Sequence, residues 1–336
     1  MKALVWSGPD RVELSDRAPK PPGPQEAQVR VKAAGISAAD LGLIGGRFPF
    51  ARPSRILGHE ISGVVEASPL KEWVGRRVVV DPALGCGRCA SCKAGRKALC
   101  EKGGELGTTQ GDGGFAEYVT VPVANLQVLP DAVAFEAGAL LEPLCGAIGA
   151  FERLPSRPGE TVLVFGSGTA GLLFVQLARL REAKMILLVG GGRARLALAP
   201  TLGATYAWSH ESGFLQDLVL SYTLGLGPDL AIEASGADGA VTQAFSWVRR
   251  GGRVLLFGLS GAFAKNLSSD TIVTRDLTVG TGIGTPSQWG RAIELGSGGK
   301  VDLASLVTHR FPLEEADRAL AAARDVDSSV KVVLTP

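Results

Sequence analysis

The sequence has no long apolar run, no excess of either charge and only one cysteine outside a single short stretch. No segment approaches the ~20 uninterrupted apolar residues that a membrane-spanning helix needs. The opening residues, MKALVWSGPD, have no apolar core of the kind that a signal peptide carries. We therefore expect a cytoplasmic protein without a membrane partner.

Charge and composition exclude further classes of protein. The 35 Lys and Arg residues nearly balance the 33 Asp and Glu residues, and neither sign forms a block. Nucleic-acid-binding proteins usually carry a basic face, so no nucleic-acid partner is expected. There are no internal repeats, and a hydrophobic content of 46% indicates a globular protein. A chain of 336 residues exceeds the size at which one core keeps growing, which predicts two domains.

Glycine and proline divide the first third of the chain into short segments with β propensity. These segments are Lys2–Trp6, Gln28–Ala33, Ile61–Glu66, Arg77–Val80, Glu117–Val121 and Leu126–Leu129. Their spacing predicts a compact, mostly β domain. Helical character begins after Asp131, with a break or kink expected at Pro143.

The middle third alternates apolar strands with helices, which predicts a parallel sheet covered on both faces. The expected strands are Thr161–Phe165, Lys184–Val189, Asp229–Ala234, Arg253–Gly258 and Asp276–Thr281, and the expected helices include Ala194–Leu202, Phe214–Leu220 and Ala240–Val248. Pro200 should disturb the last turn of its helix. The last part, Trp289–Leu334, predicts two helices and a terminal strand at Val330–Leu334. The expected fold class is α/β, a doubly wound parallel sheet beside a mostly β domain.

The segment TVLVFGSGTAG joins one of these strands to a helix through three glycines. Gly166 permits the turn, Gly168 lets a pyrophosphate approach the backbone, and Gly171 lets the helix pack on the strand. The first helical N–H groups, around Thr169 and Ala170, would face the phosphates. A plain glycine turn has the same spacing, but the flanking strand and helix favour a dinucleotide site.

A second glycine-rich stretch follows the next predicted strand and consists of Gly190, Gly191, Gly192, Arg193, Ala194 and Arg195. It has no acidic residue to accept a hydrogen bond from the ribose 2′-OH of NAD. The two arginines offer donors to a 2′-phosphate instead. They could also be surface residues, although arginine at a helix start is unfavourable unless an anion lies nearby. We predict NADP(H) as the cofactor and assign Gly258, at the end of a later strand, to the same site.

Four of the five cysteines, Cys86, Cys89, Cys92 and Cys100, lie within fifteen residues. This spacing lets four thiolates converge on a tetrahedral ion, most often Zn²⁺. The stretch around them is short of apolar residues, so a metal would replace a core. Disulfides are disfavoured in the cytoplasm, whereas an iron–sulfur cluster uses the same ligands. We predict a structural zinc, because four protein ligands leave no open coordination position.

Motifs along nearly the whole chain resemble the zinc-containing medium-chain dehydrogenase/reductases of the alcohol dehydrogenase superfamily, and most of all the sorbitol and threonine dehydrogenase branch. Besides the cysteines and GSGTAG, the motifs are AAGISAAD, ILGHEISGVV, GGFAEYVTVP, ALLEPL, IEASG, GGRVLLFG and LVTHRFPLEEADRAL. The resemblance implies a GroES-like catalytic domain at 1–144 with its zinc lobe at 85–101, a Rossmann domain at 145–283, and a return to the catalytic domain at 284–336. It also implies an active site between the domains and a dimer or tetramer.

In zinc members of this family, a cysteine, the histidine of GHE and a glutamate or second cysteine hold a catalytic zinc. That ion polarises a carbonyl or lowers the pKa of an alcohol while hydride passes to or from nicotinamide. The resemblance carries over to His59, Glu60 and Glu142, but Ser37 stands at the cysteine position. A serine hydroxyl is a poor zinc ligand. The hydroxylated residue expected two places later is also missing, while Asp40, which commonly orients the histidine, remains.

Three interpretations of this site stay open. Zinc could still be held by His59, Glu60 and Glu142, with water or Ser37, for alcohol and polyol chemistry. The catalytic zinc could instead be absent or altered, with hydride passing to an activated C=C, imine or carbonyl group. The third possibility is an NADP-binding sensor or pseudoenzyme. We favour the reductase with an absent or altered zinc, in which Ser37 and Asp40 could form a hydrogen-bonded pair that supplies a proton.

The substrate is expected between Ser37–Phe50, His59, Glu142 and Gly258–Ile283. Apolar residues near this region could line the pocket or simply pack in the core, and they are Phe48, Phe50, Ile283 and Trp289. Cys145 reads either as a packed hydrophobe or as a substitute soft ligand. His210 and His309 have no partners at ligand spacing and are assigned no chemistry.

Overall fold

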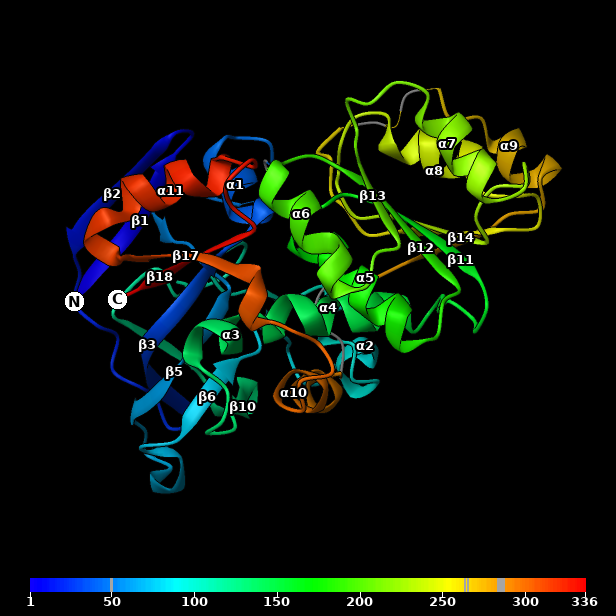
Figure 1. The fold of residues 1–336 in the computed structure, drawn as a ribbon. Helices are drawn as coiled ribbons and strands as arrows, with labels where there is room; N and C mark the ends of the chain where they lie inside the picture. Colours follow the sequence, from blue (N-terminus) through cyan, green and yellow to red (C-terminus); the bar gives the residue numbers. More distant parts are fainter. Residues whose placement is uncertain (49–50, 263, 265, 283–287) are drawn as a thin grey trace. The chain divides into compact units, whose positions relative to one another are not determined.

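The computed structural model describes residues 1–48, 51–262, 264, 266–282 and 288–336 (Figure 1). The chain divides into two compact units. The first unit comprises Met1–Cys145, Gly284–Asp325 and Lys331–Pro336, and the second comprises Gly146–Ile283 and Val326–Val330. A membrane-crossing helix, judged by length and apolar character, is not found in the described ranges.

The first unit is built on a seven-stranded sheet in the order β10-β6-β5-β3-β18-β17, with β9 also paired to β3. Its strands are β3 (Glu26–Ile36), β5 (Glu60–Ala67), β6 (Arg77–Val80), β9 (Tyr118–Pro122), β10 (Leu126–Val128), β17 (Val307–Pro312) and β18 (Lys331–Thr335). All pairs are antiparallel except β17 with β18. The expectation of a mostly β domain is confirmed.

Smaller sheets complete this unit, in the orders β2-β1-β4 and β7-β8. Their strands are β1 (Lys2–Gly8), β2 (Arg11–Asp16), β4 (Arg55–Ile56), β7 (Ala83–Leu84) and β8 (Gly104–Glu105). The helices that lie in or begin in this unit are α1 (Ala38–Ile44), α2 (Ala90–Lys93), α3 (Phe135–Ala139), α4 (Leu141–Phe151), α10 (Trp289–Ser297) and α11 (Ala316–Arg324). Alternate residues of the strands supply a valine- and leucine-rich core.

The second unit holds a six-stranded sheet in which every neighbouring pair is parallel. Its order is β13 (Tyr206–Ser209), β12 (Met185–Gly190), β11 (Thr161–Phe165), β14 (Leu230–Glu233), β15 (Arg253–Leu256) and β16 (Thr278–Thr281). In chain order this is 3-2-1-4-5-6, the order of doubly wound dinucleotide-binding sheets. The predicted fold class is therefore confirmed.

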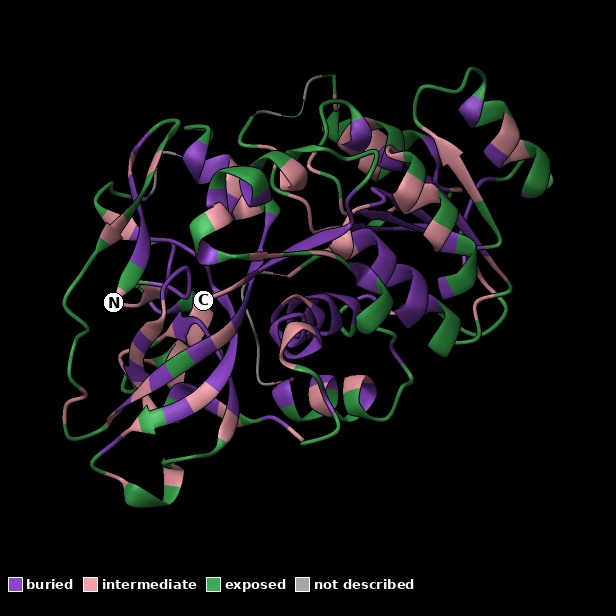
Figure 2. Ribbon diagram, turned by 60° about the vertical axis from the view of Figure 1, so that its left-hand side comes forward, coloured by how far each residue is buried: buried purple, intermediate pink, exposed green. Residues whose placement is uncertain are grey.

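Helices cover both faces of this sheet. α5 (Thr169–Leu180) and α6 (Arg193–Leu202) lie on one side, and α7 (Leu215–Tyr222), α8 (Ala240–Trp247) and α9 (Ser269–Thr274) lie on the other (Figure 1). The central strands are buried on both faces, as their purple colour in Figure 2 shows. Burial on both sides explains why these strands read as continuous apolar runs.

Two prolines have different effects from those expected. Pro143 lies in the first turn of α4, where its missing N–H has no intrahelical partner, so the break falls before it, at Leu140. Pro200 lies inside α6, but the helix continues to Leu202. This expectation was wrong because Pro200 removes one hydrogen bond close to the end of a helix that still buries Ala199 and Leu202.

Candidate functional site

Ser37 is the N-cap of α1, directly after β3. Its Oγ accepts a hydrogen bond from the backbone N–H of Asp40 at 3.0 Å, and Asp40 Oδ2 accepts from the backbone N–H of Ser37 at 2.9 Å. The Ser37 hydroxyl also donates to Asp40 Oδ2 at 2.7 Å. This reciprocal arrangement is a capping box, which satisfies the free N–H groups at a helix start. The Ser37 hydroxyl is therefore used to cap the start of α1. The spacing S-x-x-D in the sequence could have revealed this role.

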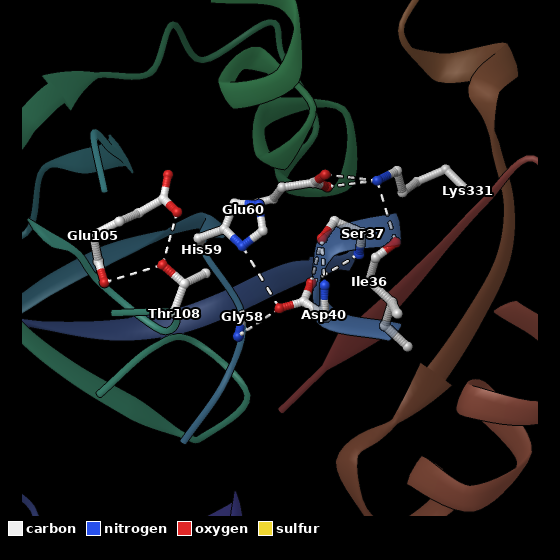
Figure 3. A network of polar contacts seen from close by, with 9 residues as sticks. All are labelled: Ile36, Ser37, Asp40, Gly58, His59, Glu60, Glu105, Thr108 and Lys331. Carbon is white, nitrogen blue, oxygen red and sulfur yellow. Dashed lines mark hydrogen bonds and ion pairs between the residues drawn. The ribbon is translucent and has the colours of Figure 1, made fainter. Parts of the chain in front are cut away.

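His59 lies beside the other oxygen of Asp40 (Figure 3). Its Nδ1 is 3.6 Å from Asp40 Oδ1, which is ion-pair distance, and the backbone N–H of Gly58 donates to the same oxygen at 3.3 Å. Both side chains are buried. Burial alone would lower the pKa of His59, but the Asp40 carboxylate outweighs it and holds that pKa well above 6.5. Burial opposes ionisation of Asp40, yet His59 and the Ser37 donors keep the pKa of that carboxyl lowered.

Glu60 follows His59 and pairs with Lys331, the first residue of β18. The Lys331 Nζ lies 2.7 and 2.8 Å from the two Glu60 oxygens and donates to the carbonyl of Ile36 at 3.2 Å. Both side chains are buried to at least nine-tenths. Gly35 makes room for the carboxylate, because a Cβ there would lie 2.0 Å from Glu60 Oε2. No local sequence pattern indicates this pair, since its members lie 271 positions apart.

Glu142 completes a buried group with His59 and Glu60. One ligand atom from each of the three lies within 4.8 Å of the others. Burial raises the pKa of Glu142 to about 8, so its carboxyl is neutral at pH 7 unless a cation offsets the loss of solvent. Imidazole nitrogen and carboxylate oxygen are ligands for zinc, and without a thiolate the set also suits Mn²⁺ or Fe²⁺. The three residues therefore fit a divalent cation.

Among the residues that the structure describes, Cys145 does not belong to this group. Cys145 is fully buried in α4, and burial raises the pKa of its thiol, which favours the packed, neutral form. Glu105 adds negative charge near His59 and accepts a hydrogen bond from the Thr108 hydroxyl at 2.7 Å (Figure 3). Sequence reasoning missed Glu105 because it lies in no recognised motif.

The four clustered cysteines meet as predicted. They are free thiols, and their sulfur atoms all lie within 4.8 Å of one another. The sulfurs of Cys89 and Cys100 are 3.8 Å apart, which is about the edge of a tetrahedron with the ~2.3 Å Zn–S bond and far beyond a disulfide. Gly85 is needed beside them, because a Cβ there would lie 2.8 Å from the Cys92 sulfur. The residues fit a structural zinc.

Replacing Cys92 by serine should remove about one zinc ion per chain, since a hydroxyl is a poor substitute for a thiolate. Elemental analysis would measure the loss, and limited proteolysis should show new cleavage within 85–101. The control is Cys145→Ser, which changes a buried thiol outside the cluster. Equal zinc content in the two variants would contradict a zinc site at the four cysteines.

The first glycine turn has the geometry that a dinucleotide requires. Gly166 adopts φ +109°, and a Cβ on Gly171 would lie 1.7 Å from the Gly166 carbonyl oxygen. Gly168 is the N-cap of α5, and Thr169 and Ala170 begin the helix. Gly171 therefore lets α5 start directly against β11, with its free N–H groups at the turn.

Ser167 joins this turn to the second glycine stretch. Its hydroxyl donates to the carbonyl of Gly191 at 2.5 Å and accepts from the N–H of Gly191 at 3.0 Å. A Cβ on Gly190 would lie 2.4 Å from the same hydroxyl oxygen. The imidazole of His210 lies against Gly191, with Nδ1 3.1 Å from the Gly190 carbonyl. The two predicted cofactor segments therefore meet at the carboxyl ends of β11 and β12.

The two arginines of the second stretch differ. Arg195 donates from Nε to the carbonyl of Ser329 at 2.6 Å. The Arg193 side chain is exposed and makes no hydrogen bond or ion pair with any residue in the described ranges. Its backbone N–H, however, donates to the carboxylate of Asp327 at 3.1 Å. No acid is present in the stretch itself, but the fold brings one to it from 134 positions away.

Several expected pocket residues cannot be placed together. Phe50 and Ile283 lie outside the described residues. Phe48 and Trp289 are both buried within the first unit, and Phe48 packs over Gly42. Gly258 approaches Glu233, because a Cβ there would lie 2.6 Å from Glu233 Oε2. An active site between the two units stays a prediction.

The chain is similar to known dehydrogenases in both of its units. Residues 23–131 match the alcohol dehydrogenase GroES-like domain, and residues 170–298 match the zinc-binding dehydrogenase family. A sorbitol dehydrogenase from Halalkalibacterium halodurans is 32% identical over all of this chain and 99% of its own. An L-galactonate-5-dehydrogenase from Escherichia coli is 31% identical over 99% of this chain and 97% of its own.

Two solved structures extend the comparison. A short chain alcohol dehydrogenase from Escherichia coli, complexed with NADH, is 28% identical with a TM-score of 0.92. A zinc-binding dehydrogenase from Sinorhizobium meliloti, bound to NADP, is 31% identical with a TM-score of 0.91. Each match covers all of this chain and 99% of the other. The chain therefore belongs to the zinc-containing medium-chain dehydrogenase/reductases of the alcohol dehydrogenase superfamily, a family of nicotinamide-dependent oxidoreductases.

Proposed function

We propose that the chain is an NADP(H)-dependent oxidoreductase that transfers hydride to or from a small organic substrate at an altered catalytic-metal site. The observation that carries this proposal is the use of Ser37. Its hydroxyl is engaged by Asp40 in the cap of α1, and no thiolate stands in its place. A cation at this site would therefore rely on His59, Glu60 and Glu142.

The donor set supports altered chemistry. Glu60 already places both oxygens within 2.8 Å of the Lys331 ammonium, so any cation would share this carboxylate. A shared ligand donates less electron density, which weakens cation binding. Substrates that are already activated, such as a conjugated C=C, an imine or an activated carbonyl, need the least additional polarisation. Reduction of such an activated group is therefore the reaction that we propose first.

Each residue has a proposed role in that reaction. A bound metal would supply Lewis acidity toward a carbonyl or alcohol oxygen. His59 and Glu142 are the buried groups able to hold or donate a proton where negative charge develops. Asp40 keeps the imidazole oriented, and the Ser37 cap fixes Asp40 at the start of α1.

The cofactor preference is proposed from the second glycine stretch. Gly190–Arg195 contains no acidic residue, and the guanidinium group of Arg193 is exposed to solvent. An arginine in this position can bind a 2′-phosphate through two hydrogen bonds. By family resemblance we also propose a cytoplasmic dimer or tetramer without a nucleic-acid or membrane partner.

A zinc-dependent alcohol or polyol dehydrogenase is the second candidate. The convergence of His59, Glu60 and Glu142 within 4.8 Å favours it, as do relatives named as sorbitol and galactonate dehydrogenases. In this case the reaction would interconvert a secondary alcohol and a ketone.

Metal content and turnover separate the two candidates. The altered-site reductase predicts about one zinc per chain and NADPH oxidation with enones or imines. The dehydrogenase predicts about two metal ions, of which Glu142→Gln loses one, and oxidation of polyols. Cofactor binding without turnover across ketones, enones, imines and polyols would contradict both and indicate a sensor.

A further inference from the structure

Five residues near the end of the chain, Val326–Val330, belong to the second unit, although α11 before them and β18 after them belong to the first. These residues lie on the second glycine stretch. A Cβ on Gly192, which has φ +84°, would lie 2.0 Å from the carbonyl oxygen of Val326. The Arg195 side chain donates to Ser329, which is almost fully buried. The segment is thus packed against the start of α6.

Asp327 accepts two hydrogen bonds from the start of α6. Its carboxylate accepts a hydrogen bond from the N–H of Arg193 at 3.1 Å, and its backbone carbonyl accepts from the N–H of Ala194 at 2.9 Å. Gly192 is the N-cap of α6 and has no side chain to supply an acceptor. Asp327 therefore supplies the anion that an arginine-rich helix start needs.

The Asp327 carboxylate lies where a dinucleotide cofactor would contact the protein. In a doubly wound sheet, the end of the second strand and the turn after it contact the adenosine ribose. A carboxylate at that turn can accept a hydrogen bond from a 2′-OH and repels a 2′-phosphate. Asp327 thus acts in the opposite direction to Arg193 and Arg195.

We propose that Asp327 is a cofactor-specificity residue whose charge weakens binding of the 2′-phosphate of NADP(H) relative to NAD(H). This inference rests on the nicotinamide cofactor of the proposed function, but not on which of the two forms the protein prefers. The preference is set by the balance between one acidic and two basic side chains that come from distant parts of the sequence. The segment Gly190–Arg195 alone contains the two arginines but not the acidic residue, Asp327, that opposes them.

The test replaces Asp327 by asparagine, which removes the charge but keeps an oxygen acceptor for the Arg193 N–H. Dissociation constants for NADPH, NADH, adenosine 2′,5′-bisphosphate and AMP are measured by tryptophan fluorescence. We expect the two 2′-phosphate ligands to bind on the order of tenfold more tightly, with NADH and AMP unchanged or weaker. The matched control is Asp217→Asn, which removes an exposed carboxylate from α7 of the same unit.

If Asp327 serves only as a cap of α6, the result is different. In that case Asp327→Asn changes all four dissociation constants by the same factor, or none of them, and the inference is overturned. Asp327→Ser, which also retains a cap acceptor, repeats the test if the asparagine variant does not fold. Tighter NADH than NADPH binding by the unchanged protein would contradict the proposed NADP(H) preference alone, because the inference concerns the change in their ratio.

Discussion

Replacing Lys331 by methionine should lower the free energy of unfolding by about 3 to 5 kcal/mol. The ammonium is buried and contacts both oxygens of Glu60 and the carbonyl of Ile36. Methionine fills a similar volume, so the main loss is that of the charge. Glu60 then keeps a buried carboxylate without its partner, and an unpaired buried charge is the costly state.

Urea unfolding followed by circular dichroism would measure this change. The double variant Lys331→Met, Glu60→Gln should recover much of the lost stability, because neither charge remains unpaired. Lys2→Met is the matched control, since Lys2 and Glu314 form an ion pair at 2.5 Å with side chains about half exposed. An exposed pair contributes little to stability, because water and salt screen its attraction. A Lys331 variant as stable as the Lys2 variant would contradict the expected role of the buried pair.

Local patterns were enough to predict much of the fold. The strand Thr161–Phe165 and the glycine turn after it depend on neighbouring residues, and the strand was placed at its observed bounds. β13 and β17 were missed. β13 is a four-residue edge strand whose residues are all at least partly exposed. β17 has one buried residue, Val307, and then alternates between exposed and half-buried positions without an apolar run. Neither carries the apolar signature of a buried parallel strand.

Residues of the candidate site could be predicted only where they lie in a recognised sequence motif. His59, Glu60 and Glu142 follow from the family motifs, and the structure places them together. Lys331 and Asp327 could not be found in this way, because each acts through long-range contacts created by packing. The capping role of Ser37 lies between these cases, since its spacing to Asp40 is a recognisable helix start.

Replacing Glu142 by glutamine should stabilise the metal-free chain at alkaline pH. Burial raises the pKa of Glu142 from 4.5 to about 8, so the folded chain holds this proton more tightly than the unfolded chain. Unfolding then releases a proton between these values, and stability falls as pH rises from about 4.5 through about 8. At about 1.4 kcal/mol per pH unit, the full difference approaches roughly 4 to 5 kcal/mol. Glutamine has no proton to release and should not show this decline.

Urea unfolding of the metal-stripped proteins at pH 5 and pH 9 would measure the difference. Glu152→Gln is the control, because it makes the same change at an exposed position just after the end of α4. A Glu142 variant whose stability declines with pH as steeply as that of the Glu152 variant would contradict the raised pKa.

The same substitution, Glu142→Gln, should lower turnover although it raises stability at alkaline pH. Glutamine cannot donate a proton as a carboxylic acid does and is a weaker cation ligand than a carboxylate, so kcat/KM should fall by about 10² to 10³. The Glu152 variant should keep its activity. A residue that serves only packing loses stability and activity together when it is replaced. Higher stability at pH 9 with lower turnover would therefore identify Glu142 as a group of the reacting site, because its burial destabilises the fold and its carboxyl chemistry supports the reaction.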